Sequence, residues 1–517
     1  MPKSHSRVQS SHSISEFTHY DEKRTWIMEE SYQPSRQSSS RQKMLVYMLF
    51  LAEAIMAASL SAQIPLLVAS SSSACSDYSS AYIRSLLECA YFFGSTCSIF
   101  WGSAADIFGR KVISMLGLVG TLACCLFMGF ATSLPGWVTL RFLAGCMSSA
   151  IFTSALAMLA DLGMPSAASL RTVSCLPLIS VCGGIGPLLQ SLVRQLGKRA
   201  PAGIWSQWPA LNGQVACAGM IFIVLLVEAF CLRETLNTES AVDRITEKAT
   251  LLGTKSEDSE TLLSVSVVDS DEEPTSICID DFLQAPSFVT LLVSFSILSL
   301  HSSTFEVLLP HLADSPANMG GMGLPCGLLN TVVTIVKAIA AIGVFYTLPK
   351  YTAKLDVLAT YRQVSVAFPA IYVLIPFFAM LATVSGAPPV SWAVFSTAAV
   401  VAKELFAELA HVLAILLAFS ASPNASSAGT GIGLLGLSNL FKALAVGVSG
   451  LSYYLSDAYS VVSINAILWA LLAVLAFTGS CVNSRLREAP LVGQDIPAEL
   501  LRWSSVFDAE SDSEADV

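Results

Sequence analysis

Apolar and polar residues alternate in long blocks along most of the chain. Twelve blocks carry few charged residues, and each is at least 19 residues long. At a rise of about 1.5 Å per residue, a helix of about 20 residues crosses the hydrocarbon of a bilayer. The pattern therefore predicts twelve membrane-spanning helices, over residues 43–69, 82–101, 112–132, 137–160, 171–194, 214–232, 286–312, 326–348, 363–382, 391–419, 428–452 and 459–482.

The twelve predicted helices fall into two groups of six. The first group covers residues 43–232, and the second covers residues 286–482. Residues 1–42 predict a disordered cytosolic arm, and residues 483–517 predict a disordered acidic tail. Residues 233–285 are rich in Thr, Ser, Glu and Asp and predict a flexible acidic linker. The predicted fold class is an all-α membrane protein with two pseudo-symmetric six-helix bundles.

The composition fits a chain whose main solvent is lipid. Hydrophobic residues make up 54% of the sequence and charged residues only 13%. The net charge of −10 is concentrated in the linker and the tail, so it gives no support for nucleic-acid binding. The thirteen cysteines lie mostly in apolar blocks without a Cys-x-x-Cys pair, which is typical of small buried side chains. We expect no cofactor and no resident metal.

The distribution of Lys and Arg predicts the side of the membrane on which the loops lie. With a cytosolic N-terminus, 20 of the 28 Lys and Arg residues fall in cytosolic segments and four fall outside. Because cytosolic loops retain positive charge, we expect both termini and the linker in the cytosol. The linker contains Leu251-Leu252 and Leu262-Leu263, which resemble sorting signals. They suggest sorting adaptors as partners and delivery to a vacuolar or endosomal membrane. The expected location is the plasma membrane or the vacuolar membrane.

The connection between the second and third predicted helices carries a dense motif. It matches Gly-x-x-x-Asp-x-x-Gly-Arg-Lys, from Gly102 to Lys111. Gly102 and Gly109 allow a close backbone approach and a tight turn. Asp106 is suited to cap a helix N-terminus or to accept a hydrogen bond from an arginine. Arg110 and Lys111 mark the cytosolic side.

This stretch resembles motif A of the major facilitator superfamily. The resemblance implies a membrane transporter with a gate, in which Asp106 meets the N-terminus of the eleventh helix. It also implies that Arg110 pairs with a carboxylate at the inner end of the fourth helix, here Asp161. The alternative is a turn that sets topology and does not gate.

Other segments resemble further motifs of that superfamily. Motif C, in which small residues let helices pack closely and a proline bends one helix, is matched by Gly183, Gly184, Gly186 and Pro187. Arg141 occupies the place of the motif B arginine, but Gln190-Ser191 stand where motif C usually has a glycine pair, which weakens a prediction of antiport. The matches over residues 43–482 are similar to the fungal and plant subgroup that includes the zinc-induced-facilitator-like transporters.

Charged side chains inside the predicted helices are candidates for the transport machinery. Each costs roughly 2.5–3.5 kcal/mol on insertion scales unless it has a partner or water. Glu53 and Glu306 occupy the first and seventh helices, which flank the central cavity in this architecture, so one or both are predicted to carry a coupling proton. The alternative is a structural ion pair, for instance with Arg141 or Lys337. The other cavity candidates are Lys337, Glu404, Glu408 and Lys442.

Glu404, Glu408 and His411 share one face of the tenth predicted helix. That face is a candidate for binding a cation or a proton, and the name of the subgroup suggests zinc. A zinc site needs three or four convergent ligands, and the sequence offers no second cluster of His or Cys to complete this one. We therefore predict no metal site.

The predicted function is secondary active transport by alternating access, as proton-coupled export of a small organic molecule. One alternative is a metal-homeostasis transporter that moves zinc or a zinc chelate. Another is a membrane sensor or scaffold that transports nothing. The sequence has neither a Gly-Lys-Ser/Thr nucleotide loop nor a nucleophile with an attendant base, so it does not predict an enzyme.

Overall fold

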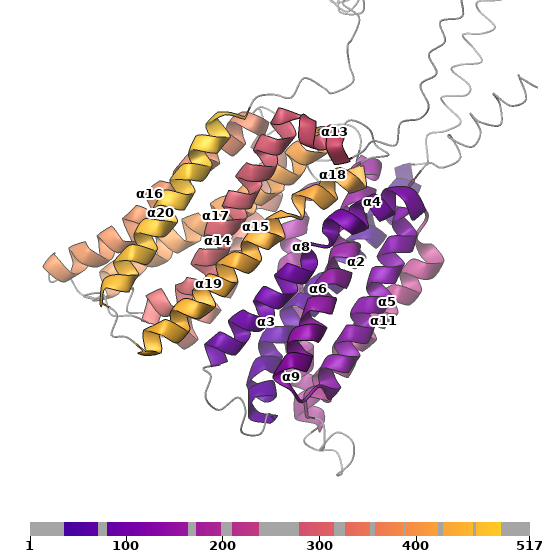
Figure 1. The fold of residues 1–517 in the computed structure, drawn as a ribbon, viewed down its shortest axis with the longest axis horizontal. Coiled ribbons are helices and arrows are strands. Elements are labelled where there is room, and N and C mark those ends of the chain that lie inside the picture. Colours follow the sequence, from indigo (N-terminus) through magenta and orange to yellow (C-terminus); the bar gives the residue numbers. More distant parts are fainter. Residues whose placement is uncertain are drawn as a thin grey trace, which may run out of the picture.

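The computed structural model describes residues 36–70, 80–163, 172–197, 209–236, 279–314, 326–351, 357–385, 389–421, 428–458 and 462–486. Within these ranges every regular element is a helix. Figure 1 shows two groups of helices side by side, the first half in indigo to magenta and the second half in red to yellow. The predicted all-α class is confirmed.

The first half packs its helices around a core of aliphatic side chains. Leu49, Leu118, Leu156 and Ile221 are buried there, one each from α2, α5, α6 and α11. Because lipid is as apolar as these side chains, close packing rather than exclusion of water holds the helices together. The helices of this half are α2 (Arg36–Ser70), α3 (Ser80–Ser95), α4 (Ser98–Phe108), α5 (Arg110–Phe130), α6 (Leu134–Gly163), α8 (Leu176–Cys182), α9 (Ile185–Gly197) and α11 (Pro209–Cys231).

The second half has a separate core that is richer in aromatic rings. Phe305, Tyr361, Phe368 and Tyr372 are all buried in it. Its helices are α13 (Ile279–Gln284), α14 (Pro286–Asp314), α15 (Cys326–Tyr351), α16 (Val357–Ser385), α17 (Pro389–Ala421), α18 (Ala428–Leu435), α19 (Ser438–Ala458) and α20 (Val462–Ser484).

Nine helices in the described ranges are long and apolar enough to cross a membrane. Three further predicted spans have local features that set them apart. The second is divided into α3 and α4, of 16 and 11 residues. The tenth, α17, carries Lys403, Glu404 and Glu408 near its middle. In the twelfth, α20, the side chains that the structure describes include the apolar segment Ile467–Asn483. The arrangement is consistent with twelve spans in two bundles.

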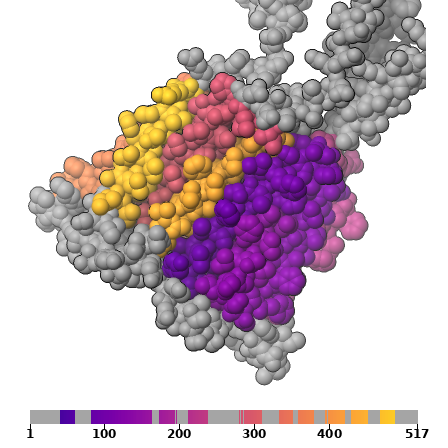
Figure 2. All heavy atoms as spheres, in the orientation of Figure 1, coloured from indigo at the N-terminus to yellow at the C-terminus, as the bar shows by residue number. Residues whose placement is uncertain are grey.

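The two halves meet where two interrupted helices run side by side. A turn at Thr96–Cys97 separates α3 from α4, and a turn at Gly436–Leu437 separates α18 from α19. The Ser98 hydroxyl donates a hydrogen bond across the seam to the Gly433 carbonyl at 3.0 Å. Gly102 lies so close to the backbone of α18 that a side chain there would collide with it. Figure 2 shows this seam between the indigo and orange surfaces.

Candidate functional site

Asp106 joins the end of α4 to the start of α18. Its carboxylate accepts hydrogen bonds from the backbone N–H groups of Gly429, at 3.0 Å, and Thr430, at 2.6 Å. The Thr430 hydroxyl donates a third, at 2.8 Å. The first N–H groups of a helix have no intrahelical acceptor and carry partial positive charge, so a carboxylate there is stabilising. One side chain thus ties the first half to the second.

Arg110 is fully buried at the start of α5, among acceptors from two other helices. Its guanidinium lies 3.4 Å from the Asp106 carboxylate and forms an ion pair with Asp161 of α6. It also donates to the Ala157 carbonyl at 3.0 Å. Removing Arg110 would leave two carboxylates without their cation. These contacts agree with the geometry that the motif A resemblance implies, and the role of these residues as a gate remains a proposal.

Gly109 alone makes the turn between α4 and α5. Its φ of 102° lies in a region that favours glycine. A Cβ atom at this position would lie 2.8 Å from a carboxylate oxygen of Glu234, which follows α11. That carboxylate accepts hydrogen bonds from the backbone N–H groups of Arg110 and Lys111, both at 3.0 Å. Glu234 therefore caps the N-terminus of α5.

Lys111, at the start of α5, binds the C-terminus of α11. Its ammonium group donates to the carbonyls of Leu232, at 2.6 Å, and Ala229, at 3.2 Å. The ends of α5 and α11 therefore cap each other. Sequence reasoning missed Glu234 as a site residue, although the Leu-x-Glu-Thr pattern at the end of the sixth predicted helix was the available signal.

The motif C glycines bring the fifth span close to α2. A Cβ atom on Gly183 would lie 2.7 Å from the Ala54 backbone, and one on Gly186 would lie 2.8 Å from the Ile55 carbonyl. The helix is interrupted at Gly183–Gly184, between α8 and α9, and Pro187 lies in the first turn of α9. The bend expected at Pro187 therefore falls at the glycine pair.

Glu53 of α2 is held by hydroxyl groups. Tyr91 of α3 and Ser148 of α6 each donate a hydrogen bond to the same carboxylate oxygen at 2.8 Å. The two hydroxyls also lie 2.7 Å apart. Within the described ranges no Lys or Arg nitrogen forms an ion pair with Glu53. This carboxylate is thus positioned by neutral donors.

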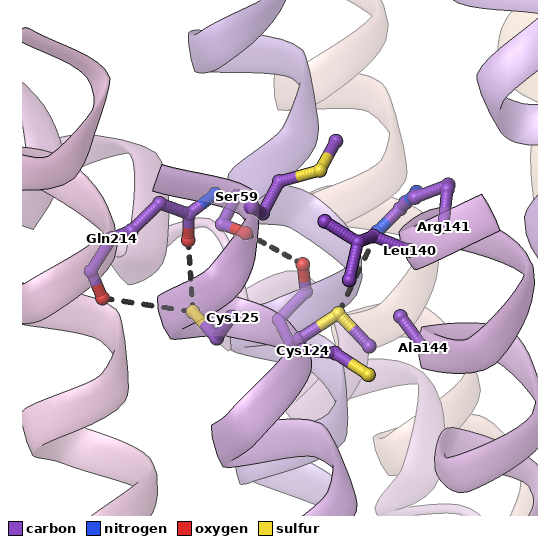
Figure 3. Close-up of a pocket in the computed structure, with 9 residues that line it drawn as sticks. Ser59, Cys124, Cys125, Leu140, Arg141, Ala144 and Gln214 are labelled. Carbon is purple, nitrogen blue, oxygen red and sulfur yellow. Dashed lines mark hydrogen bonds between the residues drawn. The ribbon is translucent and has the colours of Figure 1, made fainter. Parts of the chain in front are cut away.

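Arg141 lies beside this cluster and at the edge of a pocket. Its guanidinium carbon is 4.3 Å from the centre of the Tyr91 ring, a cation–π contact. It also donates to the Ala57 carbonyl at 3.4 Å. Figure 3 shows the pocket, which has about 300 Å³ of empty space including its mouth. Besides Arg141, its lining includes the sulfur-bearing side chains Met56, Cys124, Cys125 and Met128 and the amide of Gln214.

Glu306 of α14 belongs to an ion-pair network in the second half. Its carboxylate lies 3.2 Å from the Lys337 ammonium and 3.8 Å from that of Lys403. Lys403 pairs in turn with Glu404 at 3.0 Å and lies 4.8 Å from the centre of the Phe305 ring. Lys403 and Glu404 are fully buried, whereas the Glu306 side chain is 42% exposed. Glu306 pairs with Lys337, one of the expected partners, and with Lys403, which sequence reasoning did not connect to it.

The three residues predicted to share a face of α17 have different surroundings. Glu404 points to Lys403 in the core, and His411 contacts the Ala407 carbonyl through Nδ1 at 2.7 Å. Glu408 is half-buried and forms no hydrogen bond or ion pair with any residue of the described ranges. In that part of the chain no group of three His, Cys, Asp or Glu side chains is arranged to hold a metal ion.

Lys442 of α19 faces the junction of the two halves. Its ammonium lies 5.9 Å from the centre of the Phe92 ring of α3. The carboxylates that act on it electrostatically are Glu306, Glu53 and Glu408, from both halves. It forms no ion pair within the part of the chain that the structure describes.

Glu228 of α11 is a buried carboxylate that the sequence analysis did not single out. It is fully buried, and neither carboxylate oxygen has a hydrogen-bond partner among the described residues. The sequence feature that could have identified it is a lone glutamate within an apolar block. The leucine pairs of the linker, Leu251-Leu252 and Leu262-Leu263, lie outside the described residues.

The comparison with known families decides the class of protein. The sequence profile of the Major Facilitator Superfamily matches residues 46–448, most of the chain. The chain belongs to the major facilitator superfamily. It is therefore a transporter rather than an enzyme, and an integral, multi-pass membrane protein. Members of this superfamily bind small-molecule substrates and lie in the lipid bilayer.

Individual relatives are distant. The chain is 21% identical over 455 residues to a major facilitator superfamily multidrug transporter, mfsB, of Aspergillus fumigatus, covering 74% of this chain and 73% of the relative. The human organic anion transporter MFSD10 (TETRAN) is similar in structure, with a TM-score of 0.55 and 17% identity, over 86% of this chain and 100% of that one.

The proton:xylose symporter XylE, bound to 6-bromo-6-deoxy-D-glucose, has a similar structure too. The TM-score is 0.60 at 13% identity, over 88% of this chain and 97% of that one. At such identities the two structures support the major facilitator fold and leave the substrate open.

Proposed function

We propose that this transporter exports a small organic molecule from the cytosol in exchange for protons, by alternating access, and that Glu53 carries the coupling proton. The relative described as a multidrug transporter supports a small organic molecule as the substrate. Two bundles that meet at a seam offer the architecture for access from alternate sides.

One observation favours Glu53 over Glu306 as the proton carrier. Glu53 is held by two hydroxyls, which hydrogen-bond to it whether it is charged or neutral. Glu306 lies within ion-pair distance of two ammonium groups, which favour its charged form. A group that must gain and lose a proton in each cycle is better placed among neutral donors.

Asp106, Arg110 and Asp161 are proposed as the gate between the halves. Asp106 must leave the N-terminus of α18 for the halves to separate at this end. A double-mutant cycle on Arg110 and Asp161 tests whether their pairing is coupled to transport. The absence of coupling would favour the alternative, a turn that sets topology alone.

The experiment for the proposed function uses the full chain in vesicles with an imposed pH gradient. A trapped pH-sensitive dye reports proton movement as each member of a panel of small organic molecules is added. We expect substrate-dependent proton flux in the wild type and about a hundredfold less in Glu53→Gln. Glu88→Gln is the control for loss of a carboxylate that already has an ion-pair partner, because Glu88 lies 3.0 Å from Arg84.

Two outcomes would contradict the proposal. Unchanged pH dependence in Glu53→Gln would remove Glu53 as the proton carrier. A folded wild type that moves no member of the panel under any gradient would favour a sensor or scaffold.

The orientation is proposed from the distribution of Lys and Arg. Both termini and the linker would lie in the cytosol, on the side of the Gly109 turn. Labelling of single engineered cysteines in intact cells tests this arrangement. Modification from outside the cell at position 108, an exposed position beside this turn, would reverse it. Relocation of a tagged chain after removal of both leucine pairs would support sorting adaptors as partners of the linker.

A further inference from the structure

Two arginines of the first half are buried, and they differ in their partners. Arg110 forms ion pairs with Asp106 and Asp161. Arg141 is only 6% exposed, yet no carboxylate of the described residues lies within ion-pair distance of it. A buried carboxylic acid such as Glu228 can lose its charge by binding a proton, whereas a guanidinium stays charged. The charge of Arg141 therefore needs a partner from elsewhere.

The contacts that Arg141 does make are long or weak. One amino group lies 3.5 Å from the Met56 sulfur, and the other lies 3.4 Å from the Ala57 carbonyl. A thioether is a weak acceptor, and 3.4 Å is long for a hydrogen bond from N–H to oxygen. The Nε–H group is buried and has no partner among the described residues. Because most buried polar groups are hydrogen-bonded, this edge of the guanidinium is a candidate contact for a ligand.

The pocket beside Arg141 contains a second donor. Helices α2, α5, α6 and α11 contribute to its lining, and Figure 3 shows Arg141 and Gln214 at opposite sides of the view with Cys125 between them. The Cys125 thiol lies 2.8 Å from Gln214 Oε1 and occupies the acceptor of the amide. The amide nitrogen is left as a donor. Among the described residues that line the pocket there is one cation and no carboxylate, so the site favours an anion.

The other walls of the pocket are largely apolar and polarizable. They include the side chains of Met56, Met128, Leu140 and Cys124. Thioethers make favourable contacts with aromatic rings. The space beside Arg141 is small and opens through a mouth, so an acid group can enter while a small apolar body lies toward the mouth.

We propose that this pocket binds the carboxylate of a small organic acid, with Arg141 and Gln214 as the donors. A carboxylate matches the planar edge of a guanidinium and would supply the acceptor that the Nε–H group lacks. Chloride would compensate the charge but leave the apolar walls without a contact. The inference goes beyond the proposed function, because it concerns binding and depends on neither export nor Glu53.

The test measures binding to the purified full chain without any gradient, by isothermal titration calorimetry in a buffer free of carboxylates and chloride. The probes are benzoate, benzamide, acetate and chloride. Benzamide keeps the ring without the charge, and acetate keeps the charge without the ring. We expect benzoate to bind about tenfold or more tightly than the other three, because each of them lacks either the charge-assisted hydrogen bonds or the apolar contact.

Variants on two helices assign the donors. In Arg141→Gln we expect benzoate to lose about tenfold or more in affinity and benzamide to be unchanged. Arg141→Lys keeps the charge but lacks the planar fork, so it should retain part of the binding. In Gln214→Leu we expect about a fivefold loss for benzoate, equivalent to one hydrogen bond. Arg84→Gln removes a half-exposed cation of α3 and is the control for loss of positive charge, with binding unchanged.

The proposal is wrong if benzamide or chloride binds as tightly as benzoate, or if folded Arg141→Gln and Gln214→Leu bind benzoate like the wild type. The melting temperature of each variant shows whether it is folded. If Arg141→Gln does not fold, Arg141→Lys and Gln214→Leu decide, since weaker binding supports the site and unchanged binding overturns it.

Failure of this site is distinct from failure of the proposed function. A chain that couples proton flux to other molecules but does not bind benzoate would overturn this site alone. A chain that binds benzoate through Arg141 but shows no substrate-dependent proton flux would overturn only the proposed function.

Discussion

The first and seventh spans carry a glutamate each, and the two glutamates have opposite environments. Glu53 is bonded to the hydroxyls of Tyr91 and Ser148. Glu306 lies between the ammonium groups of Lys337 and Lys403. Our proposal therefore gives corresponding spans different roles, in which Glu53 gains and loses a proton and Glu306 belongs to a fixed ion-pair network. The predictions below test that division, from the largest expected effect to the smallest.

Lys403→Met should cause the largest loss of stability. Its fully buried ammonium group neutralises Glu306 and Glu404, and removal of one partner of a buried pair costs about 3–5 kcal/mol. The free energy of unfolding in mixed micelles measures this loss. The double variant Lys403→Met with Glu404→Gln should recover part of it. If Lys403→Met alone is as stable as the wild type, the ion-pair network contributes nothing to the free energy of unfolding.

Glu53→Gln should lower proton-driven transport by about a hundredfold, equivalent to about 2.7 kcal/mol, and leave the stability nearly unchanged. The amide can still accept hydrogen bonds from Tyr91 and Ser148, so the packing is retained. Transport rates in vesicles and melting temperatures together separate the two effects. A large loss of stability with full transport would reverse the comparison between the halves.

Glu306→Gln should mainly lower stability, by about 1–3 kcal/mol. The figure is smaller than for Lys403 because the Glu306 side chain is 42% exposed and water screens part of the pair. Transport should keep the pH dependence of the wild type. If that pH dependence disappears, Glu306 carries a proton and the two halves are more alike than their contacts indicate.

Tyr91→Phe should weaken the Glu53 cluster modestly. It removes one of the two donors to the carboxylate, worth about 1 kcal/mol, but keeps the ring on which Arg141 stacks. We expect about a fivefold slower proton-driven rate. The matched change at the other donor, Ser148→Ala, should have a similar effect. A much larger loss in Tyr91→Phe alone would mean that the phenol has a further role.

The Arg84–Glu88 pair should give the smallest effect. The Arg84 side chain is 51% exposed, and exposed pairs four residues apart on a helix contribute about 0.3–0.5 kcal/mol. Arg84→Gln should therefore leave the melting temperature within the error of the measurement. A clear loss would show that this end of α3 is less exposed to water than its surface area indicates.

Much of the architecture could be predicted because lipid imposes a strong pattern. Blocks of apolar residues indicated the helices, and the motif around Asp106 and Arg110 indicated the turn and its partners. No proline marks the break at Thr96–Cys97. The break lies where α3 and α4 pack against α18 and α19, so the local sequence gave no sign of it. Sequence analysis placed the helix boundary at Trp101, whereas α4 continues to Phe108.

The partners of the charged residues were harder to predict than their existence. Glu306 and Lys403 are far apart in the sequence, so nothing local connected them. Sequence analysis assigned Glu234 to the start of the linker because it follows an apolar block. In the structure its carboxylate caps α5. Pairing depends on how helices rotate against one another, and a single sequence contains little information about that rotation.

The paired interruptions along the seam have a mechanical consequence. At Thr96–Cys97 and at Gly436–Leu437 hydrogen bonds to the third preceding residue replace or join those of the regular α-helix, so the helix is already irregular at the points where it would bend. The contact from Ser98 to Gly433 lies beside both points. If the halves rock as we propose, this contact is a pivot: the two ends of each helix pair would move in opposite directions while Ser98 and Gly433 stay in contact.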